Sequence, residues 1–179
     1  LSLPIYLEEN DEPVWLDRDD TLEIINWTID HIRNKPENQV PTNGILSRFY
    51  ESISALEFFS FSKGLIPQNV NKTVRLAIAP EYSPYESAVT LFDHHPKNLT
   101  AESIYYIENP EKMGGIYPMI YQEIDIINAQ YIIPGRIIQI AHAQNFSSPI
   151  RYMFPDPITT AGWQMYAVQL VINEGFGDW

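Results

Sequence analysis

The chain has 179 residues and a formal charge of −12, with 23 acidic and 11 basic side chains, 45% hydrophobic residues and no cysteine. This composition excludes a disordered chain, a disulfide scaffold and a cysteine nucleophile. Duplex nucleic acid is not an expected partner, because phosphate binding needs clustered Lys and Arg. No apolar run in the sequence is long enough to span a membrane.

The acidic residues are concentrated near the N-terminus. Nine of the 23 fall within the first 30 positions, against one basic residue, Arg18. Because residues 1–20 are also punctuated by proline, we expect them to form an acidic extended arm with one short strand at Val14–Leu16. Residues 21–179 are expected to form a single α+β domain. The arm is where we expect a basic partner or a cation.

Two helices are predicted next. Asp20 can cap the first helix, and Glu23, three residues later, completes a capping-box spacing. Apolar residues then recur at steps of three and four until Pro36 ends the helix. A second helix is predicted over about residues 43–63, with Gly64 as its stop. Its apolar stripe consists of Ile45, Phe49, Ile53, Leu56 and Phe59.

Strand patterns follow the second helix. Residues Thr73–Ala79 alternate apolar and polar side chains, as a strand does. Shorter strands are predicted at Ala88–Phe92 and Ser103–Ile107. Residues Tyr131–Ala141 contain a Pro-Gly pair and predict two strands around a turn or one strand with a bulge.

The segment Trp163–Ile172 is apolar on both faces, which is typical of a central strand, with a buried helix as the alternative. The order of the elements, helices first and strands after, sets the expected fold class. We expect an α+β fold with N-terminal helices packed on a mainly antiparallel sheet.

Four Asn-x-Ser/Thr sequons occur in the chain, where chance predicts about one. Three of them lie in predicted loops, at Asn71, Asn98 and Asn145, and the fourth, at Asn26, lies in the first predicted helix. The chain also begins at Leu1 without an initiator Met, as a processed protein would. We therefore expect a secreted glycoprotein modified at the three loop positions, while loops rich in Asn, Ser and Thr remain the other explanation of the triplets.

Residues Val14–Leu22 read VWLDRDDTL. This run resembles the first motif of the haloacid-dehalogenase-type phosphatases, in which apolar residues precede D-x-D-x-T-L. The resemblance implies that Asp17 would attack phosphorus, that Asp19 would act as acid and base, and that a metal would neutralise charge. The other interpretation is an acidic loop that leads into the cap of the first helix.

The sequence has one histidine cluster, Asp93-His94-His95, followed by Pro96. With a histidine from elsewhere in the chain, these side chains have the composition of a zinc site. Adjacent histidines on a strand point to opposite faces, however, and a polar turn explains the cluster equally well. We assign no metal site.

A third set of residues is spread over the chain in the order Arg18, Ser60-Phe61-Ser62, Glu123-Ile124-Asp125 and Ile133-Pro134. This layout resembles enterotoxin-like ADP-ribosyltransferases, active or inactive. The resemblance implies that Arg18 would hold the phosphates of NAD and that Ser60 and Ser62 would shape the nicotinamide pocket. Glu123 or Asp125 would then stabilise the oxocarbenium-like transition state.

The main hypothesis is a non-enzymatic, secreted, acidic domain that acts through protein or glycan contacts and needs no cofactor. An ADP-ribosyltransferase-like enzyme that uses NAD, or an inactive relative, is the first alternative, and a metal-dependent phosphatase is the second. The 23 aromatic residues could supply a recognition surface where they lie near turns. The candidates are Tyr82, Tyr85, Tyr117, Tyr121, Phe176 and Trp179.

Overall fold

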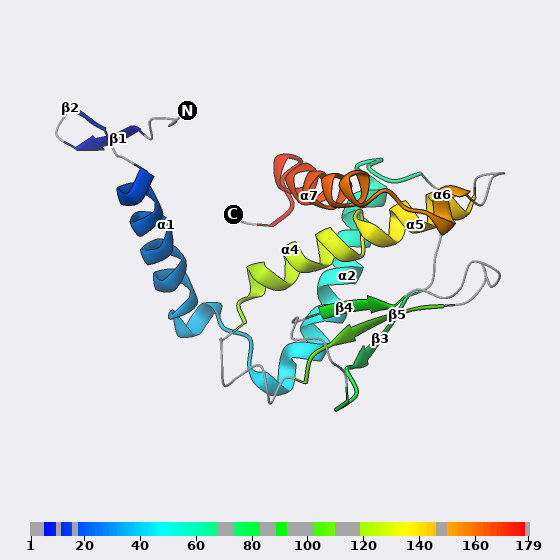
Figure 1. The fold of residues 1–179 in the computed structure, drawn as a ribbon. Helices are drawn as coiled ribbons and strands as arrows, with labels where there is room; N and C mark the ends of the chain where they lie inside the picture. Colours follow the sequence, from blue (N-terminus) through cyan, green and yellow to red (C-terminus); the bar gives the residue numbers. More distant parts are fainter. Residues whose placement is uncertain are drawn as a thin grey trace. The chain divides into compact units, whose positions relative to one another are not determined.

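The chain divides into two compact units, one of residues 1–39 and one of residues 40–179. The structure is a computed structural model (Figure 1). It describes residues 6–9, 12–15, 18–67, 74–82, 89–92, 102–109, 119–145 and 150–177.

The N-terminal unit is a hairpin followed by a helix. Strand β1 (Tyr6–Glu9) pairs antiparallel with β2 (Glu12–Trp15), which includes part of the strand predicted in the acidic arm. The first predicted helix is confirmed as α1 (Arg18–Arg33), and a short 3-10 helix, η1 (Pro36–Asn38), follows it. Two acidic residues lie in the first turn of α1, where they interact favourably with the positive end of the helix dipole.

The C-terminal unit begins with the second predicted helix, which is also confirmed. A 3-10 turn, η2 (Thr42–Gly44), leads into α2 (Ile45–Ser62). Phe49 and Leu56 on its apolar stripe are fully buried. Gly64, two residues beyond the helix, has a φ of 67°, a left-handed conformation that glycine adopts without the strain other residues incur.

A small sheet contains the three strands predicted after α2. It consists of β3 (Val74–Ile78), β4 (Val89–Phe92) and β5 (Ser103–Ile107), with β5 in the centre. β3 is parallel to β5 and β4 is antiparallel to it. Side chains of β5 alternate between buried and half-buried, so that Tyr105 and its neighbours two residues away point into the core.

Four further helices lie in the described part of this unit, and they make the predicted fold class wrong. They are α4 (Tyr121–Tyr131), α5 (Arg136–Gln144), α6 (Ile150–Met153) and α7 (Pro157–Asn173). The described residues are mostly helical, and their small sheet contains a parallel pair, so the helices do not pack on a mainly antiparallel sheet. The error lies in the C-terminal half, where helices replace the predicted strands.

Two segments account for this correction. Residues 131–141 hold the end of α4, a turn at Pro134-Gly135 and most of α5, and not a strand or a hairpin. Their isoleucines favour strands by intrinsic propensity, but burial of α5 in the core overrides that preference. The segment Trp163–Ile172 lies within α7, so the helical alternative to a strand is correct, although the helix is exposed on one side and not buried all round. An apolar run of this kind does not reveal its period because nearly every position is apolar.

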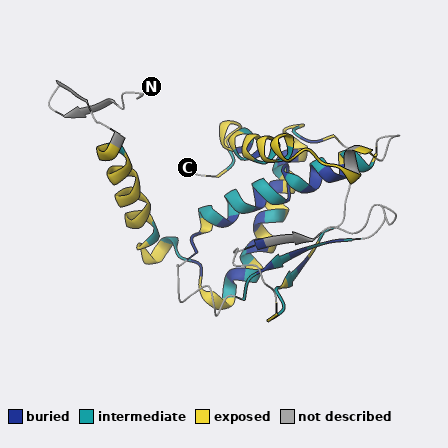
Figure 2. Cartoon of the chain, in the orientation of Figure 1, coloured by how far each residue is buried: buried dark blue, intermediate teal, exposed yellow. Residues whose placement is uncertain are grey.

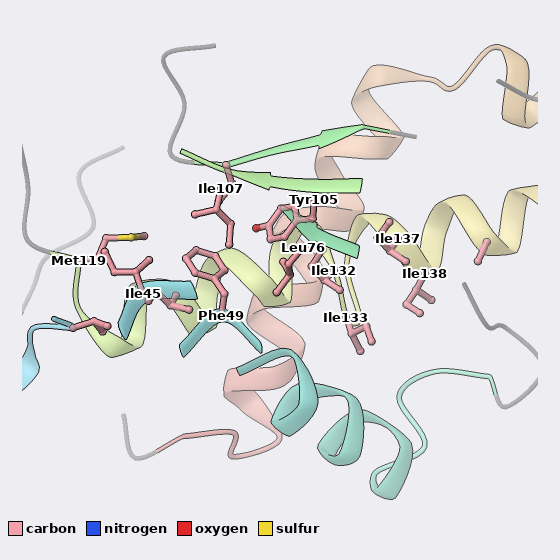
Figure 3. Close-up of a cluster of buried hydrophobic side chains, with 14 of the residues drawn as sticks. Ile45, Phe49, Leu76, Tyr105, Ile107, Met119, Ile132, Ile133, Ile137 and Ile138 are labelled. Atoms are coloured by element: carbon pink, nitrogen blue, oxygen red, sulfur yellow. The ribbon is translucent and has the colours of Figure 1, made fainter. Parts of the chain in front are cut away.

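The core lies between α2, the sheet and the α4–α5 pair. Figure 3 shows Phe49 of α2, Tyr105 and Ile107 of β5, and Ile132 and Ile137 near the α4–α5 turn in one cluster of buried side chains. The rings of Phe49 and Tyr105 meet edge to face, with their centroids 6.1 Å apart, an arrangement that aromatic pairs prefer.

A second, smaller cluster joins α2, α4 and α7. It is formed by Leu56, Ala129 and Val171, and Phe59 packs edge to face against Phe176 beside it. In Figure 1, α4 and α5 run between the sheet and α7. One side of α7 is therefore packed against the unit, and Figure 2 shows its other side coloured as exposed.

Candidate functional site

The predicted serines lie on opposite sides of α2. Ser60 is fully buried, and its hydroxyl has no hydrogen-bond partner among the described residues. Ser62 is exposed, and its Oγ donates to the Phe59 carbonyl at 2.8 Å. Positions two residues apart on a helix point in nearly opposite directions, so these hydroxyls do not line one pocket. Arg18 begins α1 in the other unit, and its side chain is outside the described part of the structure.

The predicted acidic pair lies on α4, and both carboxylates contribute to the fold. Glu123 Oε2 accepts a hydrogen bond of 3.4 Å from the Ile120 amide and so caps the start of α4. Asp125 points towards α2, where Arg48 Nη2 donates to its Oδ1 at 2.5 Å. The two carboxylates therefore have different partners on different sides of the helix.

Asp125 belongs to a polar seam between α2 and α4, formed by Arg48, Ser52, Tyr121, Asp125 and Asn128. The Arg48 guanidinium lies 5.4 Å from the centre of the Tyr121 ring while it binds Asp125. One turn further along, Asn128 Nδ2 donates to the carbonyl of Phe49 at 3.2 Å. These contacts fix the register of two helices that otherwise meet through apolar side chains.

The seam also contains polar atoms without a hydrogen-bond partner among the described residues. They are Ser52 Oγ, Arg48 Nε and Asn128 Oδ1, and in the adjoining core Tyr105 has an unpartnered hydroxyl. Burial, with a smaller effect of the neighbouring Tyr131, raises the pKa of Tyr105 well above its usual value. This phenol therefore stays neutral in the core.

The α2–α4 polar seam supplies one carboxylate, and that carboxylate is already paired with an arginine. Among the described residues, no three side chains of the metal-binding types gather at one point. The cluster Asp93-His94-His95 and the predicted nucleophile Asp17 lie outside the described residues, so the structure does not place them. The contacts of the α2–α4 polar seam therefore serve to pack α2 against α4.

The turn between α4 and α5 is held closely by α7. An added Cβ at Gly135 would lie 1.9 Å from the carbonyl oxygen of Gln130, so only glycine fits there without a shift of the backbone. Trp163 Nε1 of α7 donates to the carbonyls of Pro134 and Gly135, each at 3.1 Å. Arg136 Nη1 extends the contact to Thr160 Oγ1, also on α7, at 3.1 Å. The inner side of α7 is thus fixed by specific contacts.

The outer side of α7 is different in character. None of the 17 residues of this helix is charged. We call the exposed apolar residues Ile158, Met165, Tyr166 and Ile172 the α7 outer face. Ile158 is 82% exposed and Met165 is 65% exposed. Three of these residues recur every seven positions, close to two helical turns, so they form a row along the helix.

The sequence shows that this segment is apolar, but it does not show that one side of the helix stays exposed. The run Trp163–Ile172 is apolar at positions on every side of the helix. A segment apolar all round is typically buried all round. Among the described residues of the C-terminal unit, the packing partners of α7 lie on one side of the helix, and the apolar positions on its other side form the α7 outer face.

Comparison with protein-family models, curated proteins and solved structures finds no match to this chain. In addition, no helix in the described part of the structure is both long enough and apolar enough to cross a lipid bilayer.

Proposed function

We propose that the chain is a non-enzymatic protein-binding domain and that the α7 outer face is its contact surface. The observation that supports this proposal is a 17-residue helix without a charge whose apolar side chains Ile158 and Met165 are mostly exposed. The solvated side of a helix normally carries charged and polar residues. An exposed apolar row on a well-packed helix is typical of a surface that binds another protein.

The chemistry of this face favours a protein over a glycan. A glycan presents hydroxyl groups, and burial of hydroxyls against Ile158, Met165 and Ile172 without hydrogen bonds would cost free energy. Isoleucine and methionine side chains instead match the apolar centre of a protein interface. Tyr166, at the edge of the face, can keep its hydroxyl in water while its ring is covered.

The test uses a photo-reactive amino acid in place of Met165, in the full chain and in its native surroundings. We expect a covalent adduct with a defined protein, and we expect Ile158→Lys to reduce its yield. The control variant carries the same photo-reactive group at Phe58, an exposed apolar position on α2 that is 78% exposed. An adduct that forms equally well from both positions, or none from Met165, would contradict the proposal.

Incubation with NAD tests the enzymatic alternative. We expect the chain to release no nicotinamide, because Asp125 is paired with Arg48 and Ser60 is buried. Release of nicotinamide by the purified chain, abolished by Asp125→Asn, would instead support ADP-ribosyl chemistry and overturn a purely binding role.

We propose further that the protein is secreted and glycosylated at Asn71, Asn98 and Asn145. Asn145 is exposed at the C-terminal end of α5, a position that a glycan can occupy without disturbing the core. Asn71 and Asn98 lie outside the described residues. Mass spectrometry of material from the native source tests the proposal, and three unmodified asparagines would contradict it.

A further inference from the structure

The α7 outer face has the spacing of a helix-pairing seam. Ile158, Met165 and Ile172 are seven residues apart, and Ala161 and Val168 lie between them at steps of three and four. This is the a and d pattern of a heptad repeat, in which apolar residues line the contact between two helices. Ala161 is exposed, whereas Val168 is half-buried and packs against the Leu56, Ala129 and Val171 cluster. The exposed part of the seam therefore consists of Ile158, Ala161, Met165 and Ile172.

The row is symmetric about Met165. Ile158 precedes it and Ile172 follows it by the same seven positions, a rise of about 10 Å in each direction along the helix. A two-fold contact between identical chains needs a patch that is complementary to itself. An antiparallel pair of such helices would place Met165 on the two-fold axis and Ile158 beside Ile172 of the second copy.

We infer that the α7 outer face binds α7 of a second copy of this chain, antiparallel and centred on Met165. This inference rests on the proposed function and names the partner of the same surface. The distribution of charge favours α7 as the place where two copies of this acidic chain meet. Two chains of charge −12 repel one another, and α7 offers them a row of 17 residues without a charge along which to meet.

The acidic residues at the two ends of α7 allow a prediction of how salt affects the dimer. Asp156 caps the start of α7 and Glu174 follows its last turn. An antiparallel pair brings Asp156 of one chain towards Glu174 of the other, and these like charges oppose the contact at both ends. Added salt screens that repulsion, so the dimer should become tighter as ionic strength rises. Asp156→Asn, which keeps a capping side chain, should also tighten it.

Sedimentation equilibrium of the full chain provides the first test, from about 1 to 200 μM, because interfaces of modest area associate in that range. We expect a monomer–dimer equilibrium that Met165→Lys weakens by about tenfold or more, because two cations would meet on the axis. Phe58→Lys, which adds the same charge to an exposed position on α2, should leave the equilibrium unchanged. Dimers that both substitutions disrupt equally would overturn the assignment to α7.

Cross-linking tests the register, and the absence of cysteine from the chain makes single-cysteine variants unambiguous. With a short bis-maleimide, Met165→Cys should give covalent dimers. Ile158→Cys and Ile172→Cys should give them only when the two variants are mixed, since identical positions would lie about 20 Å apart. Efficient dimers of Ile158→Cys with itself would overturn the antiparallel arrangement.

The two proposals fail in different ways. A chain that stays monomeric over the whole concentration range overturns the inference of a second copy. If a different protein is then cross-linked through Met165, the proposed binding role is retained. If neither a dimer nor a cross-linked partner is found, both proposals are wrong.

Discussion

Arg48 of α2 and Asp125 of α4 stand 77 positions apart in the sequence, yet their side chains form a hydrogen-bonded ion pair of 2.5 Å. Their side chains are only 17% and 12% exposed. The aspartate that the sequence places in an acidic pair therefore joins two helices. Its partner, Arg48, has no part in the sequence-based hypotheses, because nothing along the chain links the two positions.

Removal of one member of this pair should destabilise the fold. Asp125→Ala leaves the Arg48 guanidinium poorly solvated and without its anion, and we expect a loss of about 2–3 kcal/mol of unfolding free energy. Urea denaturation measures it. The double variant Arg48→Met with Asp125→Leu should recover most of the loss, because apolar side chains of similar size remove the charge and fill the space.

The control for this experiment is a second ion pair in the same unit. Lys63 Nζ lies 3.6 Å from Glu174 Oε2, and both side chains are 44% exposed. Such a pair contributes at most about 1 kcal/mol because water screens it. A loss on Glu174→Ala as large as that on Asp125→Ala would contradict the role assigned to the α2–α4 polar seam.

Two buried polar side chains should respond to truncation by different amounts, because only one of them has a hydrogen-bond partner among the described residues. Asn128→Ala removes the hydrogen bond to the Phe49 carbonyl inside the core, and we expect a cost of about 1–3 kcal/mol. Ser60→Ala removes a buried hydroxyl that has no partner among the described residues, so we expect a change within about 0.5 kcal/mol. A large loss from Ser60→Ala, measured by thermal and urea unfolding, would show that its hydroxyl is used.

Gly135 and Gly162 allow a comparison between a glycine where an added Cβ would clash and one where it would not. Gly135→Ala would bring its Cβ within 1.9 Å of the Gln130 carbonyl oxygen, so we expect a loss at or above the roughly 1–3 kcal/mol usual for overpacking. Gly162 lies within α7 and has no atom within 4 Å of an added Cβ. Gly162→Ala should therefore stabilise the chain by about 0.5–1 kcal/mol, because alanine favours a helix.

The comparison is made by urea denaturation at low protein concentration, where association between chains does not contribute. Equal effects of Gly135→Ala and Gly162→Ala would contradict the close approach of the α4–α5 turn to the end of α4.

Local patterns predicted those elements whose two sides differ in polarity. The helix α2 has a clear apolar stripe with glycine at its end, and the sequence of β3 has apolar residues at every second position, so the sequence predicts both elements. The helix α7 lacks such contrast because it carries no charge on any side, so periodicity could not separate a helix from a strand. In α5 the buried isoleucines lie on one side, but the helix has only nine residues and isoleucine favours strands, so its sequence predicted a strand.

The contacts of the candidate site depend on distant parts of the chain. The Pro134-Gly135 pair predicts either a turn or a bulge, but the Trp163 indole that holds the turn comes from a helix 29 positions later. Glu123 and Asp125 on α4 stand out in the sequence by their spacing, but only the folded structure shows which groups their carboxylates contact. Sequence patterns locate turns and faces, while tertiary packing decides which partners they meet.

The start of α7 should be sensitive to acid. Asp156 caps the helix, accepting hydrogen bonds from the Thr159 hydroxyl and amide and from the Ile158 amide. These bonds, chiefly that from the Thr159 side chain, lower the pKa of Asp156 below its ordinary value. Because the folded chain holds the carboxylate more strongly than the unfolded chain does, the cap is complete above the unfolded pKa and is lost as the pH falls through the folded pKa.

Amide hydrogen exchange at Thr159, followed from pH 7 towards acid and corrected for the intrinsic rate, measures this transition. We expect protection to fall in the acid range below the ordinary aspartate pKa of about 4. Asp156→Asn should remove that pH dependence, because a neutral amide oxygen can still accept from the Thr159 amide but does not titrate. An unchanged acid transition in Asp156→Asn would assign it to another carboxylate and would show that this cap does not control the start of α7.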